Sequence, residues 1–188
     1  MPKVSVEADA KADPQRVWDL VTALPRVGEW NTMHEGFTGE VPETIGAGTT
    51  YRQRVKLMGM PAEMAWRVAA ATAPDGGAPG RLEQNGDGPM GVKAKNLFVI
   101  EPAGEGSHIT YEMEFIGPAL KGPMAGMLEK QAGAAGEQAL AKLIALLDRS
   151  PCWADRAAGP SALLEPIALL GWAGAVSAAA GGWPGRGG

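Results

Sequence analysis

The chain has 188 residues, enough for one domain with a sizeable core, and its 17 basic and 21 acidic residues give a net charge of −4. No basic run is present, so we expect no nucleic-acid partner, because phosphate binding needs a concentrated basic patch. The one cysteine, Cys152, excludes an internal disulfide and a cysteine-based metal site. The N-terminus lacks the apolar run of a signal peptide. These features are typical of a protein of the reducing cytoplasm.

The N-terminal part of the chain predicts one strand followed by two short helices. Apolar and polar residues alternate over residues 4–10, which is the period of a strand with one buried face. Asp13 and Pro14 predict a helix start, since aspartate caps helices and proline suits the first helical position. Residues 26–34 predict a second short helix, which contains Trp30.

Most of the following segment, up to residue 116, predicts strands joined by short turns. The loops are too short to hold crossover helices, so neighbouring strands should be antiparallel. The last strand is the clearest, because Ile109, Tyr111, Met113 and Phe115 alternate with polar residues. With the N-terminal strand the count is about seven, and the other strands are expected at residues 36–42, 49–58, 62–71, 81–85, 92–100 and 107–115.

A long helix is expected after the breaker Gly117-Pro118 and through Asp148. Its C-terminal half places Leu140 and Leu143 on one apolar stripe, which predicts the face that docks on the rest of the domain. A half-buried strand followed by so long a helix suggests a sheet wrapped around that helix.

Residues 149–188 differ from the rest of the chain. They are rich in alanine, glycine and proline with no steady period, so we expect the domain to comprise residues 1–148 and the remainder to be a disordered or loosely helical tail. Residues 166–185 carry no charge. Their alanine and glycine content would insert only weakly into a bilayer, so we expect no membrane anchor.

The order of strand, two helices, six strands and long helix resembles the helix-grip fold of the START-like superfamily (SRPBCC), also called polyketide cyclase/dehydrase and lipid-transport proteins. The resemblance rests on the segment DPQRVWDLVTALPRVGEWN and on the terminal TYEMEF strand. It covers about residues 2–148 and implies an α+β domain in which a strongly curved antiparallel sheet surrounds the C-terminal helix. The sequence is most similar to an actinobacterial branch named as toxins of type II toxin–antitoxin pairs.

In a helix-grip fold, the concave face of the sheet and the long helix enclose a cavity, which is the default ligand site. The inward positions are mainly apolar, with a few hydroxyl and amide groups among them. They suit a flat or apolar molecule, although the same pattern also fits a filled core whose polar groups bond to one another. The expected cavity residues are Trp30, Tyr51, Gln53, Val55, Met64, Trp66, Asn96, Phe98, Tyr111, Met113 and Phe115.

Glycines on the long helix suggest that space is left beside it. Extending the apolar stripe backwards in steps of three and four gives Gly136, Gly133, Glu129 and Gly126. Each interior glycine costs about 1 kcal/mol relative to alanine, so the row should have a structural reason. We therefore add Gly126, Glu129 and Gly133 to the expected cavity. The alternative is a helix that kinks at these glycines and keeps Glu129 on the surface.

Three side chains are candidates for catalysis. A desolvated Glu129 could serve as a general acid or base, Tyr111 could polarise a carbonyl, and His34 could be a base at the cavity entrance. His34 also fits a surface or helix-end position. The two histidines are far apart in the sequence and no cysteine pair is present, so we expect no metal, and no motif calls for a cofactor.

Two hypotheses for function follow. The resemblance implies a protein that binds a small hydrophobic molecule, lipid-like or polyketide-like, and that could act as the toxin of a type II pair with an antitoxin partner. The alternative is a cyclase- or dehydratase-like enzyme that uses Tyr51, Asn96, Tyr111 and Glu129.

Overall fold

The computed structural model describes residues 2–57, 59–118, 120 and 122–149. The expected tail, with Cys152 and the uncharged segment 166–185, lies outside the described residues apart from Arg149. Within the described part, no helix has the length and apolar character needed to cross a bilayer.

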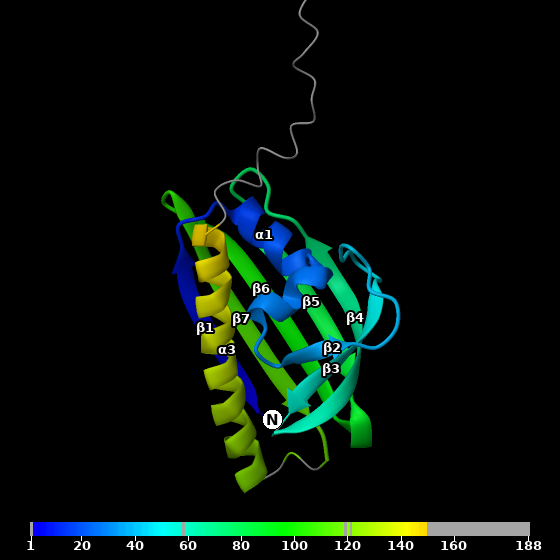
Figure 1. The fold of residues 1–188 in the computed structure, drawn as a ribbon. Helices are drawn as coiled ribbons and strands as arrows, with labels where there is room; N and C mark the ends of the chain where they lie inside the picture. The colour runs from blue at the N-terminus through cyan, green and yellow to red at the C-terminus, as the bar shows by residue number, and fades with distance from the viewer. Residues whose placement is uncertain (1, 58, 119, 121, 150–188) are drawn as a thin grey trace, which may run out of the picture. The chain divides into compact units, whose positions relative to one another are not determined.

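One curved antiparallel sheet carries the fold, with its strands in the order β1-β7-β6-β5-β4-β3-β2 (Figure 1). Neighbouring strands in the sheet are neighbours in the chain, except that β1 pairs with the last strand, β7. This arrangement confirms the expected seven-stranded helix-grip architecture. The strands are β1 (Lys3–Ala10), β2 (His34–Phe37), β3 (Thr50–Leu57), β4 (Met60–Thr72), β5 (Gly80–Asp87), β6 (Lys93–Ala103) and β7 (Gly106–Ile116).

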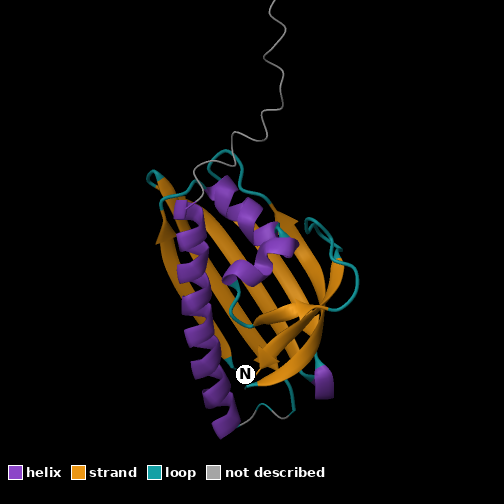
Figure 2. Cartoon of the chain, viewed as in Figure 1, coloured by secondary structure: helices purple, strands orange, loops and turns teal. Residues whose placement is uncertain are grey.

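The helices lie over one face of this sheet, as Figure 2 shows by colour. They are α1 (Pro14–Thr22), the short 3₁₀ turn η1 (Leu24–Arg26), α2 (Val27–Trp30) and the long α3 (Pro123–Arg149), with a further turn η2 (Pro89–Gly91) at the end of β5. Helix α3 runs beside β1 (Figure 1), and α1 packs on β6 and β7. The core fills the space between these helices and the concave face.

Strand alternation decides which side chains reach the core. In β3 and β7, every second residue is buried while its neighbours are exposed or half-buried. Because side chains alternate across a strand, the apolar set of each sequence pattern faces the helices.

The start of α1 is confirmed, and the end of the second helix is not. Asp13 Oδ1 accepts a hydrogen bond from the Arg16 N–H at 3.1 Å, as a helix cap does. The predicted helix over residues 26–34 is too long, since α2 ends at Trp30. Asn31 Oδ1 accepts from the Met33 N–H at 3.0 Å, an Asx turn that competes with a further helical turn. His34 then begins β2.

Two strands extend further than predicted, and each includes a proline near its end. The sequence predicts a strand from residue 62, yet β4 begins at Met60 and Pro61 pairs with Lys56. Likewise β6 continues through Pro102 to Ala103. Both prolines lie within two residues of a strand end, where the missing ladder hydrogen bond is least costly.

Helix α3 docks through a different face from the one expected at its N-terminal half. Its buried positions are Leu128, Ala132, Gly136, Ala139, Leu140, Leu143 and Leu147. The stripe therefore continues backwards from Gly136 in steps of four, to Ala132 and Leu128, and leaves Gly133 half-buried. Gly136 permits a close approach, since a Cβ there would lie 2.8 Å from Met113 Cε and 3.0 Å from Val6 Cγ2.

We predict that Gly136→Val destabilises the domain by about 1–3 kcal/mol, because the added carbons would press α3 away from β1 and Met113. The matched control is Gly126→Val on the same helix, where a Cβ meets no heavy atom within 4 Å. Urea unfolding followed by circular dichroism measures both. Equal effects of the two substitutions would contradict close packing at Gly136.

Candidate ligand-binding cavity

A cavity lies between the concave face of the sheet and the segment that carries α1, η1 and α2. Its wall includes the strand residues that were expected to line the cavity and also Trp30. These residues are Trp30, Tyr51, Gln53, Val55, Met64, Trp66, Asn96, Phe98, Tyr111, Met113 and Phe115.

Further residues outside the expected set also line the cavity. Leu82 and Gln84 are alternate residues inside the expected strand 81–85, so they would have been found if its inward face had been assigned. Asn31 and Met33 lie between α2 and β2, where no periodicity marks a side chain as inward. The other lining residues outside the expected set are Val21, Leu24, Val27, Leu57, Val92 and Ala94.

The three expected residues of α3 do not line this cavity. Gly126 and Glu129 are exposed, and Gly133 is half-buried against Val4. Leu128, the neighbour of Glu129, occupies the inward position, and successive helical residues point about 100° apart. The expectation that Glu129 enters the cavity as an acid or base is therefore wrong.

His34 lies behind the wall rather than in it. Its Nδ1 is 2.8 Å from Gln53 Nε2, and its ring packs at 4.6 Å from that of Phe37. The amide of Gln53 is a donor, so Nδ1 accepts and the imidazole is neutral in this arrangement. Burial lowers the pKa of His34, which favours the same neutral form. His34 thus orients Gln53, and Gln53 is the residue that reaches the cavity.

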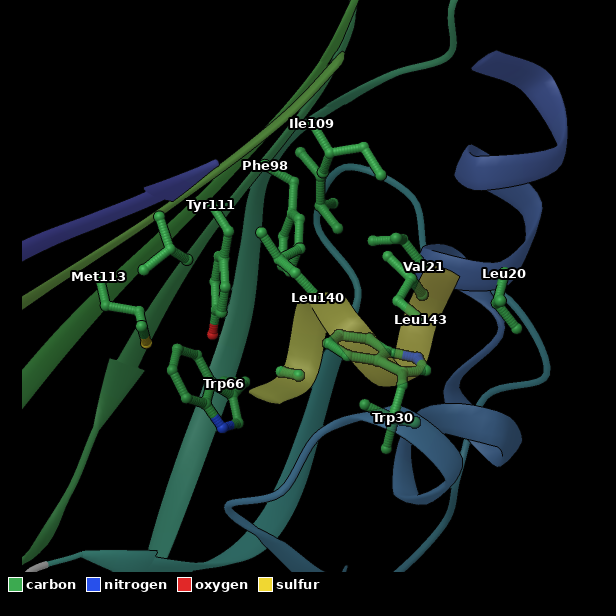
Figure 3. Close-up of a cluster of buried hydrophobic side chains, with 14 of the residues drawn as sticks. Leu20, Val21, Trp30, Trp66, Phe98, Ile109, Tyr111, Met113, Leu140 and Leu143 are labelled. Atoms are coloured by element: carbon green, nitrogen blue, oxygen red, sulfur yellow. The ribbon is translucent and has the colours of Figure 1, made fainter. Parts of the chain in front are cut away.

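An aromatic stack forms the centre of the wall (Figure 3). Phe98 and Tyr111 are opposite each other in β6 and β7, and their rings lie parallel with centroids 4.0 Å apart. Trp30 meets Phe98 edge-on at 5.8 Å. Aromatic contacts of these two kinds are favourable beyond the area they bury, so the stack is a rigid surface.

The wall carries polar groups but no charge, since its described lining residues include no Asp, Glu, Lys or Arg. Gln84 Nε2 donates to the Tyr51 hydroxyl at 3.0 Å. Burial raises the pKa of Tyr51 and of Tyr111 well above the ordinary value, so both phenols are neutral. The indole N–H groups of Trp30 and Trp66 are buried without an acceptor among the described residues.

The cavity is small in this structure. Its volume is about 50 Å³, whereas pockets for drug-sized ligands hold about 300–1,000 Å³. A groove of about 250 Å³ lies outside it, beside α3, and Met33 lines both the groove and the cavity. Met33 therefore separates the interior from the surface.

The loop that carries Met33 is tied down on two sides. The Lys56 N–H donates to the Met33 carbonyl at 2.8 Å, which fixes the loop to β3. Thr32 Oγ1 donates to the Ala135 carbonyl at 3.2 Å, which fixes it to α3.

Among the described residues, no group of three or more His, Cys, Asp or Glu is placed to hold a metal ion.

Tyrosine ionisation gives a direct check of this burial, because the chain has two tyrosines and both line the cavity. We expect no tyrosinate absorbance step near pH ~10, where exposed tyrosines ionise. The tyrosine hydroxyls lose their protons at a lower pH in the unfolded chain than in the folded chain. The free energy of unfolding should therefore fall as pH rises above about 10. A tyrosinate absorbance step near that pH, while the circular dichroism remains native, would contradict the burial of the two tyrosines.

The chain resembles mycobacterial proteins in sequence. Toxin Rv0910 from Mycobacterium tuberculosis (strain ATCC 25618 / H37Rv) is 33% identical over 128 residues, which cover 68% of this chain and 85% of that protein. Uncharacterized protein Rv1546 from the same strain is 32% identical over 124 residues, covering 66% of this chain and 83% of that protein.

Solved structures share the fold at lower identity. TTHA0849 from Thermus thermophilus superposes with a TM-score of 0.62 at 21% identity, covering 78% of this chain and 97% of that one. CV1439 from Chromobacterium violaceum gives a TM-score of 0.60 at 15% identity, covering 79% and 99%. The family model described as polyketide cyclase / dehydrase and lipid transport matches residues 1–148. With its helix-grip fold and internal cavity, the chain belongs to the polyketide cyclase/dehydrase and lipid-transport family.

Proposed function

We propose that this protein binds a small hydrophobic molecule, lipid-like or polyketide-like, in the internal cavity and does so in the cytoplasm. The observation that carries the proposal is the cavity wall itself, which is apolar and aromatic with a few neutral polar groups. Such walls are typical of small-molecule sites, where few polar groups fix the orientation of a mostly apolar ligand.

A ligand has to open the cavity before it can bind, because a volume of about 50 Å³ holds no more than a few waters. The loop over residues 31–33 is the element that can move with the smallest loss of stabilising contacts. Two of its anchors are single hydrogen bonds, one to β3 and one to α3. Met33 is an unbranched side chain that repacks easily, and a groove already lies outside it.

We predict that Ala94→Phe weakens binding of the uncharged dye Nile red at least tenfold, about 1.4 kcal/mol. Ala94 is 2% exposed and lines the cavity, so the added ring would take up the ligand's space. The matched control is Ala65→Phe, on the exposed face of β4. Fluorescence titration measures the affinity.

Thermal unfolding of both alanine variants shows whether each one folds. Affinity that Ala94→Phe leaves unchanged in a folded protein would place the dye elsewhere and contradict the proposal. Native mass spectrometry of the purified wild-type protein then asks whether a ligand is retained from the cell.

We further propose that the protein is the toxin of a type II pair, in which a protein antitoxin is the partner. The support is the name of the mycobacterial relatives, of which one pair is called a toxin at 33% identity. Induced expression in a bacterial host is then expected to arrest growth, and co-expression of the adjacent gene to relieve the arrest. Harmless expression of the folded protein would contradict this role. Comparison of Ala94→Phe with Ala65→Phe in the same assay separates action through the cavity from action through the surface.

The alternative of a cyclase- or dehydratase-like enzyme has less support. One of its expected groups, Glu129, is exposed on α3. Tyr51, Asn96 and Tyr111 do line the cavity. As neutral groups they can donate hydrogen bonds to a carbonyl, but none accepts a proton readily at neutral pH. These observations favour binding over proton transfer.

A further inference from the structure

Two hydrogen-bond donors in the cavity wall lack an acceptor. The indole Nε1 atoms of Trp30 and Trp66 are buried and have no partner among the described residues, and both side chains line the cavity. An indole N–H can only donate. A buried donor without an acceptor is unfavourable and rare in native structures, so each one calls for an explanation.

Packing holds both indoles in place, so neither can simply turn toward solvent. A Cβ at Gly86 would lie 2.8 Å from Trp66 Cε3 and Cζ3, which means that the six-membered ring rests on the bare backbone of β5. Trp30 stands edge-on against Phe98. Figure 3 shows the two indoles entering the same region from different elements, Trp30 from α2 and Trp66 from β4.

Neighbouring polar groups point to the same kind of ligand. The Tyr51 hydroxyl already accepts from Gln84, so its own proton is left to donate. Gln53 and Gln84 each use one amide N–H, on His34 and on Tyr51, and each keeps a second N–H that can donate. The described wall offers no cation to neutralise a carboxylate or a phosphate, and burying an unpaired charge is strongly unfavourable.

We propose that the ligand is an uncharged, flat molecule whose carbonyl or ether oxygens accept hydrogen bonds from Trp30 and Trp66. The aromatic side chains of the wall, among them Trp30, Trp66 and Phe98, favour a planar ligand, because aromatic rings pack well against one another. Fatty acids and other carboxylates are disfavoured. This inference rests on the proposed function, since it names the class of ligand for the same cavity.

Three probes of one shape test the inference: fluorenone, fluorene and fluorene-9-carboxylate. Each competes with Nile red for the wild-type protein. We expect fluorenone to bind about tenfold tighter than fluorene, although its carbonyl makes it less hydrophobic, and the carboxylate to bind most weakly. Binding of fluorene or of the carboxylate as tight as that of fluorenone would overturn the inference.

Removal of each donor identifies the residue responsible. Trp66→Phe and Trp30→Phe delete the N–H and keep an aromatic ring, so at least one of them should lower the fluorenone-to-fluorene ratio several-fold. Trp18→Phe is the matched control, because Trp18 is buried but does not line the cavity. A ratio unchanged in both folded cavity variants would overturn the assignment to the indoles.

The two proposals fail in different ways. Nile red that binds wild-type protein and weakens with Ala94→Phe, together with no preference for fluorenone, contradicts only the ligand class. Absence of Nile red binding and of a retained ligand in the native mass spectrum contradicts the proposed function itself. Should a tryptophan variant not fold, the three-probe comparison on wild-type protein still decides the ligand class.

Discussion

The register between β6 and β7 is the constraint on which the rest of the cavity depends. Phe98 lies opposite Tyr111, and Asn96 lies opposite Met113. Because side chains alternate strictly, a slip of β7 by one residue would turn Tyr111 and Met113 outward and bring Glu112 and Glu114 inside. The apolar set fits only one register, and that register also stacks the two rings, on whose surface the edge of Trp30 then rests.

The strand residues that line the cavity were predictable from sequence, because the alternation of apolar and polar residues shows which face of a strand is buried. The phase of α3 was not, since Gly133 and Gly126 carry no side chain whose hydrophobicity could mark a face, and Leu128 and Ala132 define the true stripe. Residues of the loop before β2 follow no period at all. Unpaired indoles are likewise invisible in sequence, because a missing partner is a property of three-dimensional packing.

The face through which α3 docks decides which of its groups reach the cavity. A helix that left room beside its glycines would supply a carboxylate to the ligand. The helix observed instead closes on β1 and Met113 through Gly136, and its contribution to the cavity region is to hold the loop through the Ala135 carbonyl. The polar chemistry of the interior is thereby left to neutral side chains of the sheet and α2, which suits recognition more than proton transfer.

The position of the loop over residues 31–33 has a consequence for the affinity of the cavity for a ligand. A ligand that enters only an open form has an apparent dissociation constant equal to the intrinsic constant divided by the open fraction. The hydrogen bond from Thr32 to the Ala135 carbonyl holds the loop in the position described here. Residues outside the cavity wall can therefore influence the apparent affinity by holding the loop in place.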